Sequence, residues 1–494
     1  SVEDWSFNDR EIRTSRCDVI EFRLANNLYN NNDAQYGNSV ANRFHEDEFD
    51  MSGSIFDVYN CGGGEGNEVS LVWVDVEEEA SVDYSASEGN ACAFTAPDVY
   101  VDPNIDQECL EEGCGFQNNP FKTINRALEI ILPSESNPIT IHLAEGTYSP
   151  ESGEIFPIII IPNLSIIGDG QNTTLLDAGF ADMGISIENS SNNTIAHLTI
   201  QGIQNPGNLG WNSMRGAIGM AYSSPYINNI TISNNLGVGL WISHYSDPYI
   251  SNITIENNTL HGIYIENQCN PLIANSTIQN HNTNSYPAIL FRYSLGRVYN
   301  VDIINNNGNA IEFSAVWNEP GVILENITAT NNGGYGFELD EAYDIYMVNS
   351  IIWDNELSDS FNHFMIGSGE LEYNYSNIVH PYPDLGYDLP YWGNISDDPQ
   401  FNDDYSLGAN SPCIDTGHPN LWHNDLDGSR NDMGRNGGLF VYPSFKSYDF
   451  GEIGDLGASS LLEIYNARNY SIVIDSVTFS NNDIFNTNSI FPMD

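Results

Sequence analysis

The sequence predicts an all-β protein whose main part is a right-handed parallel β-helix over residues 96–445. One observation is a repeat: Pro225-Tyr226-Ile227 recurs 23 residues later as Pro248-Tyr249-Ile250, and again as Pro271-Leu272-Ile273. A second is that each unit contains short alternating strands separated by Asn and Gly, with no helical period. Because each coil packs only on its neighbours, 494 residues can form such a solenoid without one oversized core.

A column of asparagines predicts where the coils turn. Successive units also share an asparagine at Asn229, Asn252, Asn275, Asn300, Asn326 and Asn349. Five residues after these lie Asn234, Asn257, Asn280, Asn305 and Asn331, then Asp354. Stacked asparagines can form hydrogen bonds along the axis, so we expect a ladder at this turn. The many Asn-x-Ser/Thr triplets follow from these turns, which makes glycosylation the weaker interpretation.

The strand that follows the asparagine column should separate inward from outward side chains, because successive side chains of a strand point to opposite faces. The predicted inward positions are Ile185, Ala217, Leu240, Ile263, Ile289, Ile311 and Phe337, and two residues later Ile187, Gly219, Ile242, Ile265, Phe291, Phe313 and Leu339. The predicted outward columns are Ser186, Ile218, Trp241, Tyr264, Leu290, Glu312 and Glu338, and Glu188, Met220, Ser243, Glu266, Arg292, Ser314 and Asp340.

The two ends differ from the repeated middle. Residues 120–132 have helical periodicity and predict a short helix that caps the first coil, followed by a strand at Ile139–Leu143 and a turn at 146–148. Residues 1–95 predict a small β-rich region. Residues 446–494 alternate like a partial immunoglobulin-like β-sandwich, since a complete one has about seven strands.

The charge balance restricts the partners. The chain has 68 acidic and 14 basic residues, a net charge of −54, which argues against nucleic acid and against an anionic membrane surface. No apolar run is long enough to span a bilayer. Such acidity fits a saline exterior or multivalent cations, although it can also serve solubility alone. We therefore expect an extracellular or cell-surface protein.

Seven cysteines are present, and none forms a zinc-binding pattern. Cys109 and Cys114 lie close enough in sequence to close a small disulfide, and Cys61 with Cys92 is a weaker pairing. The odd number leaves at least one thiol free or paired between chains.

Beyond the repeats, the sequence resembles the secreted bacterial right-handed β-helix repeat proteins of the pectate-lyase-like superfamily. The resemblance covers about residues 97–440. It is carried by Tyr100-Val101-Asp102-Pro103, Asn119-Pro120-Phe121-Lys122-Thr123-Ile124, Asp398-Pro399-Gln400-Phe401 and Ser411-Pro412-Cys413-Ile414-Asp415-Thr416-Gly417. It implies the fold, and a cell-surface or secreted location without an assigned activity; kinship with polysaccharide lyases is analogy alone.

The outward columns contain the candidate site. Glu312 and Glu338 lie in one column on adjacent coils, about 4.8 Å apart at the backbone, with Asp340 two residues along. These carboxylates suit either Ca²⁺ or a general acid/base pair, or are an ordinary acidic face. The candidate catalytic residues are Glu312, Glu338 and Arg292. The candidate carbohydrate-binding residues are Trp241, Tyr264, Glu266 and Arg292, where exposed aromatic rings would stack on sugars unless a partner or the loop at 204–214 covers them.

A second candidate calcium site comprises Asp425, Asp427 and Asp432, whose spacing resembles a calcium loop without the complete EF-hand pattern. The alternative is a structural terminal cap in which Arg430 pairs with a nearby aspartate.

These observations favour a non-catalytic extracellular protein that acts in adhesion, carbohydrate contact or assembly. One alternative is a polysaccharide-active enzyme using Glu266, Arg292, Glu312, Glu338 and Asp340. Lyase chemistry is disfavoured, because the face offers a single basic residue to stabilise a carbanion-like state. Another alternative is a filament subunit, in which the C-terminal strands of one chain pair head-to-tail with the N-terminal region of the next.

Overall fold

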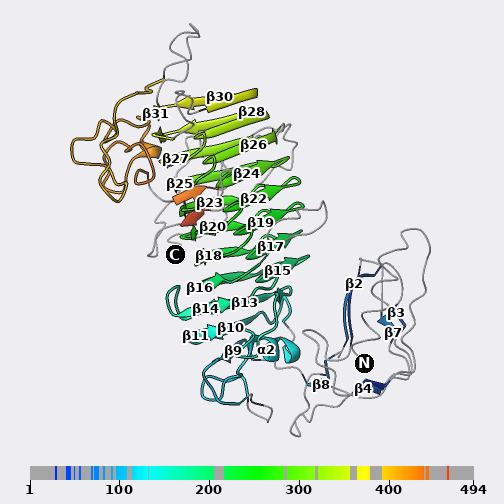
Figure 1. Ribbon diagram of the computed structural model, residues 1–494. Helices are drawn as coiled ribbons and strands as arrows, with labels where there is room; N and C mark the ends of the chain where they lie inside the picture. The colour runs from blue at the N-terminus through cyan, green and yellow to red at the C-terminus, as the bar shows by residue number, and fades with distance from the viewer. Residues whose placement is uncertain are drawn as a thin grey trace, which may run out of the picture. The chain divides into compact units, whose positions relative to one another are not determined.

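Stacked β-coils form most of the computed structural model (Figure 1). The structure describes residues 96–107, 114–131, 133–204, 216–282, 286–316, 321–355, 364–378, 392–438 and 441–443, together with Cys109 and isolated short strands elsewhere. The chain divides into two units, Ser1–Ile141 and His142–Asp494.

In the first unit, a strand and a short helix follow residue 95. Strand β9 (Asp98–Val101) is followed by α2 (Ile124–Ile130), whose N-cap Thr123 accepts a hydrogen bond from the backbone of Arg126. The helix buries Ile124, Ala127 and Leu128, the i, i+3, i+4 pattern of one face. The helix expected within 120–132 is thus confirmed, while its role as a cap remains a prediction.

The Cys109–Cys114 disulfide is also confirmed. Before residue 96 the structure gives only the short strands β1 (Leu28–Tyr29), β2 (Val40–His45), β3 (Phe49–Asp50), β4 (Ile55–Phe56), β5 (Glu68–Val69), β6 (Val72–Val76), β7 (Val82–Asp83) and β8 (Ala91–Cys92). The predicted domain at 1–95, the side chains of Cys61 and Cys92, and most of 446–494 lie outside the described residues.

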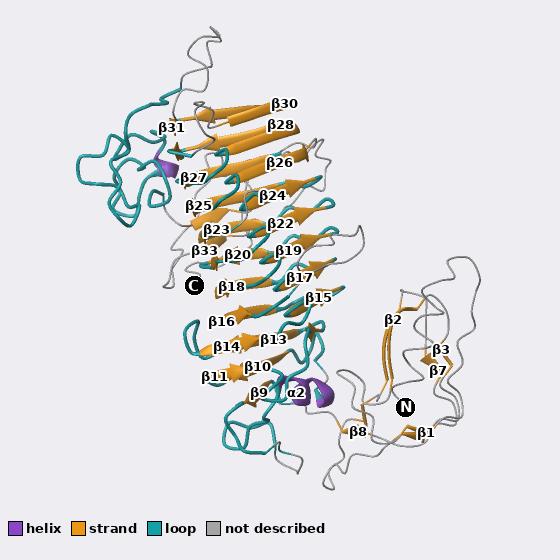
Figure 2. Ribbon diagram, in the orientation of Figure 1, coloured by secondary structure: helices purple, strands orange, loops and turns teal. Residues whose placement is uncertain are grey.

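In the second unit, parallel pairing links each coil to the next in three runs of strands (Figure 2). The first run is β12 (Ile158–Ile160), β15 (Ile185–Glu188), β17 (Ile218–Ala221), β19 (Leu240–Ser243), β22 (Ile263–Glu266), β24 (Ile289–Arg292), β26 (Ile311–Val316), β28 (Phe337–Val348) and β30 (Phe364–Asn374). Strand β10 (Ile139–Leu143) spans the boundary between the two units. The other two runs of the second unit use β11 (Gly146–Tyr148), β13 (Leu164–Gly168), β14 (Thr174–Asp177), β16 (Thr194–Gln201), β18 (Tyr226–Ser233), β20 (Tyr249–Ser251), β21 (Thr254–Glu256), β23 (Leu272–Gln279), β25 (Gly296–Ile304), β27 (Val322–Thr330), β29 (Ile351–Trp353) and β31 (Asn377–Ile378). The predicted 23-residue repeat is confirmed, since Tyr226 pairs with Tyr249 and Tyr249 with Leu272.

A buried asparagine ladder lies one residue beyond the predicted column, while within that column Asn331 Nδ2 donates to Asn305 Oδ1. The predicted residues adopt left-handed backbone, as at Asn234 (φ 57°) and Asn331 (φ 55°), a conformation that Asn tolerates. Their side chains are at or near the surface, and the following side chain enters the interior. The buried ladder therefore comprises Asn235, Asn258, His281, Asn306, Asn332 and Asn355. Its amides bond from coil to coil, for example Asn306 Nδ2 to Asn332 Oδ1 at 2.9 Å.

The inward columns are confirmed at Leu240, Ile263, Ile289, Ile311 and Phe337 and at the positions two residues later, all fully buried. The prediction is wrong at one coil. Ile185 pairs with Ile218 and Ile187 with Met220, so Ile218 and Met220 point inward, and Gly219 lies outward. Both alternations were possible there; the structure buries the larger apolar pair, and a slip of one residue exchanges the two faces.

The C-terminal part of the second unit packs against the bends of β25, β27 and β28. The side-chain amide of Asn326 donates to the carbonyl oxygens of Asp432 and Gly434, and Arg435 forms a 3.1 Å ion pair with Asp302. This part contains the 3-10 helix η1 (Leu421–His423) and the antiparallel strands β32 (Val441–Pro443) and β33 (Ile464–Asn466). No helix in the described part of the chain is long and apolar enough to cross a membrane.

Candidate functional site

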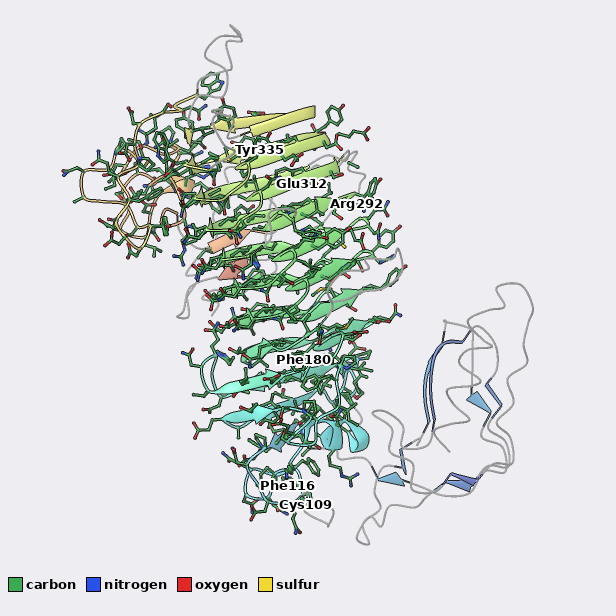
Figure 3. The ribbon with its side chains drawn as sticks, in the orientation of Figure 1. Cys109, Phe116, Phe180, Arg292, Glu312 and Tyr335 are labelled. Carbon is green, nitrogen blue, oxygen red and sulfur yellow. A yellow bond between two sulfur atoms is a disulfide. The ribbon has the colours of Figure 1, made fainter. Side chains whose placement is uncertain are left out.

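The predicted polar face is present on the first run of strands. Leu290 pairs with Glu312 and Glu312 with Glu338, while Glu266 pairs with Arg292, Arg292 with Ser314 and Ser314 with Asp340. We call Glu266, Arg292, Glu312, Glu338 and Asp340 the polar strip. Figure 3 shows Arg292 and Glu312 on neighbouring strands β24 and β26. Trp241 and Tyr264 pair in the same run, which confirms that the aromatic and acidic columns share one parallel sheet.

The aromatic end of this face is not exposed, contrary to the prediction. Trp241 and Tyr264 are only 4% and 5% exposed and belong to a cluster with Val238 and Leu260. The imidazole of His261 stacks on Tyr264 at 5.2 Å between ring centroids, and Tyr286 packs edge-on against His261. Side chains from the turns therefore cover the outward side of the strands here. Sugar stacking on these two rings would require the cluster to open.

The buried rings instead position polar groups. Glu266 accepts hydrogen bonds from Trp241 Nε1 at 3.1 Å and from the Tyr264 hydroxyl at 2.9 Å. The same hydroxyl accepts a long 3.4 Å hydrogen bond from Arg292 Nη1. Tyr264 thus bridges Glu266 and Arg292. Burial raises the pKa of Tyr264 to about 12, so the hydroxyl stays protonated as a donor.

The acidic end of the strip is electrostatically perturbed. Burial, and then the charges of Glu338 and Asp340, raise the pKa of Glu312 to about 7, with Arg292 opposing them. Glu338 accepts a 2.5 Å hydrogen bond from Asn309 Nδ2, and Asn309 is held in turn by the backbone of Tyr335. A protonated carboxyl beside a hydrogen-bonded carboxylate can donate a proton or a hydrogen bond near neutral pH.

The second candidate calcium site is a set of backbone caps. Asp425 accepts hydrogen bonds from the backbone nitrogens of Asp432 (2.9 Å) and Gly438 (2.5 Å), and Asp432 from that of Asp415 (2.7 Å). Asp427 accepts from Ser429. The carboxylates thus already serve the local fold, and they do not fit a preformed calcium cage.

Arg430 does not pair with an aspartate in the way suggested; it donates to the carbonyl oxygens of Gly417 and Thr416. Across the described ranges, no group of three His, Cys, Asp or Glu side chains is placed to hold a metal ion, in the polar strip or here. Calcium binding remains a prediction without geometric support.

Sequence reasoning missed the residues that support the strip: Asn309, His261 and Tyr286. They come from turns, where no strand alternation indicates orientation. It also missed a serine ladder at another turn. The backbone nitrogen of Ser190 donates to the hydroxyl of Ser223 on the next coil, and that of Ser223 donates to the hydroxyl of Ser246. Buried Cys269 continues the column, because its sulfur accepts from the backbone nitrogen of Ser246. The Ser-to-Ser spacing of the repeat was the signal that could have revealed it.

Residues 111–349 match the profile of a family described as a protein of unknown function (DUF1565). A comparison with curated proteins finds no match.

Among solved structures, the chain is similar to pectate lyase Pel9A, at 14% identity and a TM-score of 0.46, with 69% of this chain and 96% of that chain covered. It is similar to pectin methylesterase PemA from Erwinia chrysanthemi at 16% identity (50% and 82% covered, TM-score 0.35). It is also similar to tailspike protein 2 of bacteriophage CBA120 at 12% identity (56% and 47% covered, TM-score 0.38). Scores this low carry no information about activity. From its strand pairing, the chain is a parallel β-helix protein.

Proposed function

We propose that this chain is an extracellular β-helix protein that contacts carbohydrate through the polar strip without cleaving it. The observation that carries the proposal is the regular placement of hydrogen-bonding side chains, one coil apart, along a single run of parallel strands. Sugar hydroxyls both donate and accept hydrogen bonds, and the strip offers carboxylate acceptors beside a guanidinium donor. A polymer lying along the coil axis would meet these groups in sequence.

Two further features support an exterior location. The Cys109–Cys114 disulfide is typical of oxidising compartments, and the net charge of −54 suits a saline medium in which self-repulsion is screened.

The experiment is binding of soluble polysaccharides by affinity electrophoresis, with Arg292→Ala and Glu266→Gln as strip variants. Either substitution should weaken binding by several-fold while the far-ultraviolet circular dichroism spectrum is kept. Retardation of both variants equal to that of the unchanged protein would contradict the proposed location.

Glycoside hydrolysis is the second candidate, and the raised pKa of Glu312 beside Glu338 favours it. The strand spacing of about 4.8 Å is comparable with the roughly 5–5.5 Å between carboxyl groups of retaining glycosidases. Glu312 would then protonate the leaving oxygen while ionised Glu338 attacks the anomeric carbon, and water would release the sugar from Glu338.

Release of reducing ends separates the two candidates. Hydrolysis requires a signal that Glu312→Gln and Glu338→Gln each abolish while polysaccharide binding persists. Binding without any such release supports the non-catalytic function.

A further inference from the structure

Exposed tyrosines follow the strands of this face at the next turn. Tyr222, Tyr245 and Tyr293 come directly after β17, near the end of β19, and directly after β24, and they are 51%, 61% and 39% exposed. The rings of Tyr222 and Tyr245 are stacked, with centroids 6.1 Å apart and planes inclined by 26°. The guanidinium of Arg292 lies 5.5 Å from the centroid of Tyr293, which connects this tyrosine row to the polar strip.

The backbone of these tyrosines is unfavourable for their side chains. All three have left-handed φ angles, of 50°, 55° and 51°. In the strand register Tyr222 and Tyr293 align with Asn189 (φ 48°), His244 (φ 49°) and Asn267 (φ 61°), and Tyr245 lies one position later, level with Gln268 (φ 66°). A left-handed conformation costs an ordinary residue about 1–2 kcal/mol, whereas Asn tolerates it.

Packing offsets this cost only in part, because more than a third of each tyrosine faces solvent. Backbone strain held by exposed aromatic side chains points to a role outside folding.

We propose that the tyrosine row is a carbohydrate-stacking site continuous with the polar strip, and that its ligand is an uncharged polysaccharide aligned with the coil axis. The inference rests on the proposed function and names its substrate class.

Three observations identify this occupant. Tyr222 and Tyr245 lie on adjacent coils and Tyr293 lies two coils beyond Tyr245, with coils about 4.8 Å apart, so an extended polymer along the axis can engage several of the rings. Each ring offers an apolar face with a polar hydroxyl at its edge, the combination that fits a sugar ring. The neighbouring strip contains four carboxylates and one guanidinium in a chain of net charge −54, a field that repels a polyuronate.

The test uses Tyr222→Asn, Tyr245→Asn and the double variant. Because Asn fits the left-handed backbone, these proteins should melt at the same temperature as the unchanged protein or higher. The matched control is Tyr226→Ser, which removes a 38% exposed tyrosine that stacks on Tyr249 in a different run of strands.

Binding is measured by calorimetry with galactomannan, xyloglucan and mixed-linkage β-glucan as uncharged probes and polygalacturonate as the charged one. We expect at least one uncharged probe to bind. Its affinity should fall by about threefold to tenfold for each ring removed and stay unchanged in Tyr226→Ser. Tighter binding of polygalacturonate than of every uncharged probe, or no binding of any uncharged probe, overturns the proposal.

The strip variants distinguish this inference from the proposed function. Loss of binding in Arg292→Ala with full binding in the double tyrosine variant refutes the tyrosine row and leaves the polar strip in place. Loss in the tyrosine variant with full binding in Arg292→Ala and Glu266→Gln supports the row and refutes the strip as the contact.

Discussion

His281 is a neutral imidazole built into an asparagine ladder, and this should make the protein sensitive to acid. The side chain is 1% exposed, between Asn258 and Asn306 in the column. Its Nδ1 lies 3.1 Å from the carbonyl oxygen of Asn258, which fixes Nδ1 as the donor in the neutral ring. Among the described residues, Nε2 has no hydrogen-bond partner. Burial lowers the pKa of His281 to about 4.

The direction of the pH effect follows from these two states. The folded pKa of about 4 lies below the unfolded value of 6.5, so the unfolded chain binds a proton first as the pH falls. The stabilisation is complete above pH 6.5 and is lost progressively toward pH 4. At pH 5 the loss is about 2 kcal/mol for this one histidine. Burial lowers the pKa of His261 to about 4 as well, so a second contribution of the same sign remains in any His281 variant.

The perturbation is His281→Asn, which restores the residue type of the other ladder positions. Urea unfolding between pH 5 and pH 8 at constant ionic strength measures the free energy of unfolding. At pH 7.5 the variant should be at least as stable as the unchanged protein, because an amide can satisfy both neighbours. At pH 5 the difference in free energy of unfolding between the variant and the unchanged protein should be larger by about 2 kcal/mol, in favour of the variant.

Parallel stability curves for His281→Asn and the unchanged protein across this range would refute the reasoning.

Other substitutions test separate parts of the structure. Glu312→Gln should raise the melting temperature more at pH 8 than at pH 5, because the pKa of Glu312 in the folded protein, about 7, lies above its unfolded value and the unchanged protein loses stability as the pH rises through this range. An equal gain in melting temperature at pH 5 and pH 8 would argue against a buried charge. Arg435→Ala should cost about 3 kcal/mol in urea, because it leaves the buried carboxylate of Asp302 unpaired, and much less in an Asp302→Asn background; additive losses would contradict the pairing. Gly262→Ala should destabilise by about 2–3 kcal/mol, because its Cβ would lie 2.7 Å from Ile278 Cγ2, whereas Gly428→Ala meets no atom within 4 Å and should cost about 1 kcal/mol for its φ of 86°; equal losses would show that space is not the cause.

Much of the coil architecture could be predicted because it repeats. Tyr226, Tyr249 and Leu272 occupy one column in sequence and in space, since each coil uses the same turns and strand lengths. The same regularity allowed the sequence to predict that Glu312 pairs with Glu338. Where the repeat length changed, the predicted register was wrong by one residue. Ile185 and its partner Ile218 are 33 positions apart, and alternation alone did not determine whether Ala217 or Ile218 aligns with Ile185.

Burial of an outward side chain was not predictable from the strand that carries it. Trp241 and Tyr264 point away from the interior of the coil, as alternation requires, yet Leu260, His261 and Tyr286 cover them. These covering residues come from turns, whose backbone has no fixed period. The chemistry of the site thus depends on segments for which sequence gives the weakest signal, although the strands below them are well defined.

The exceptions at the turns carry more information about this protein than the repeats do. A left-handed turn position is served by Asn and an interior ladder position by an amide, as Asn267 and Asn306 show. Tyr245 and His281 break these two rules in different ways: one places an exposed ring on strained backbone, the other a buried imidazole among amides. Each substitution by asparagine should therefore stabilise the fold, Tyr245→Asn at any pH and His281→Asn chiefly in acid. If only the first also removes polysaccharide binding, strain at the turn serves recognition, and the ladder histidine affects stability alone.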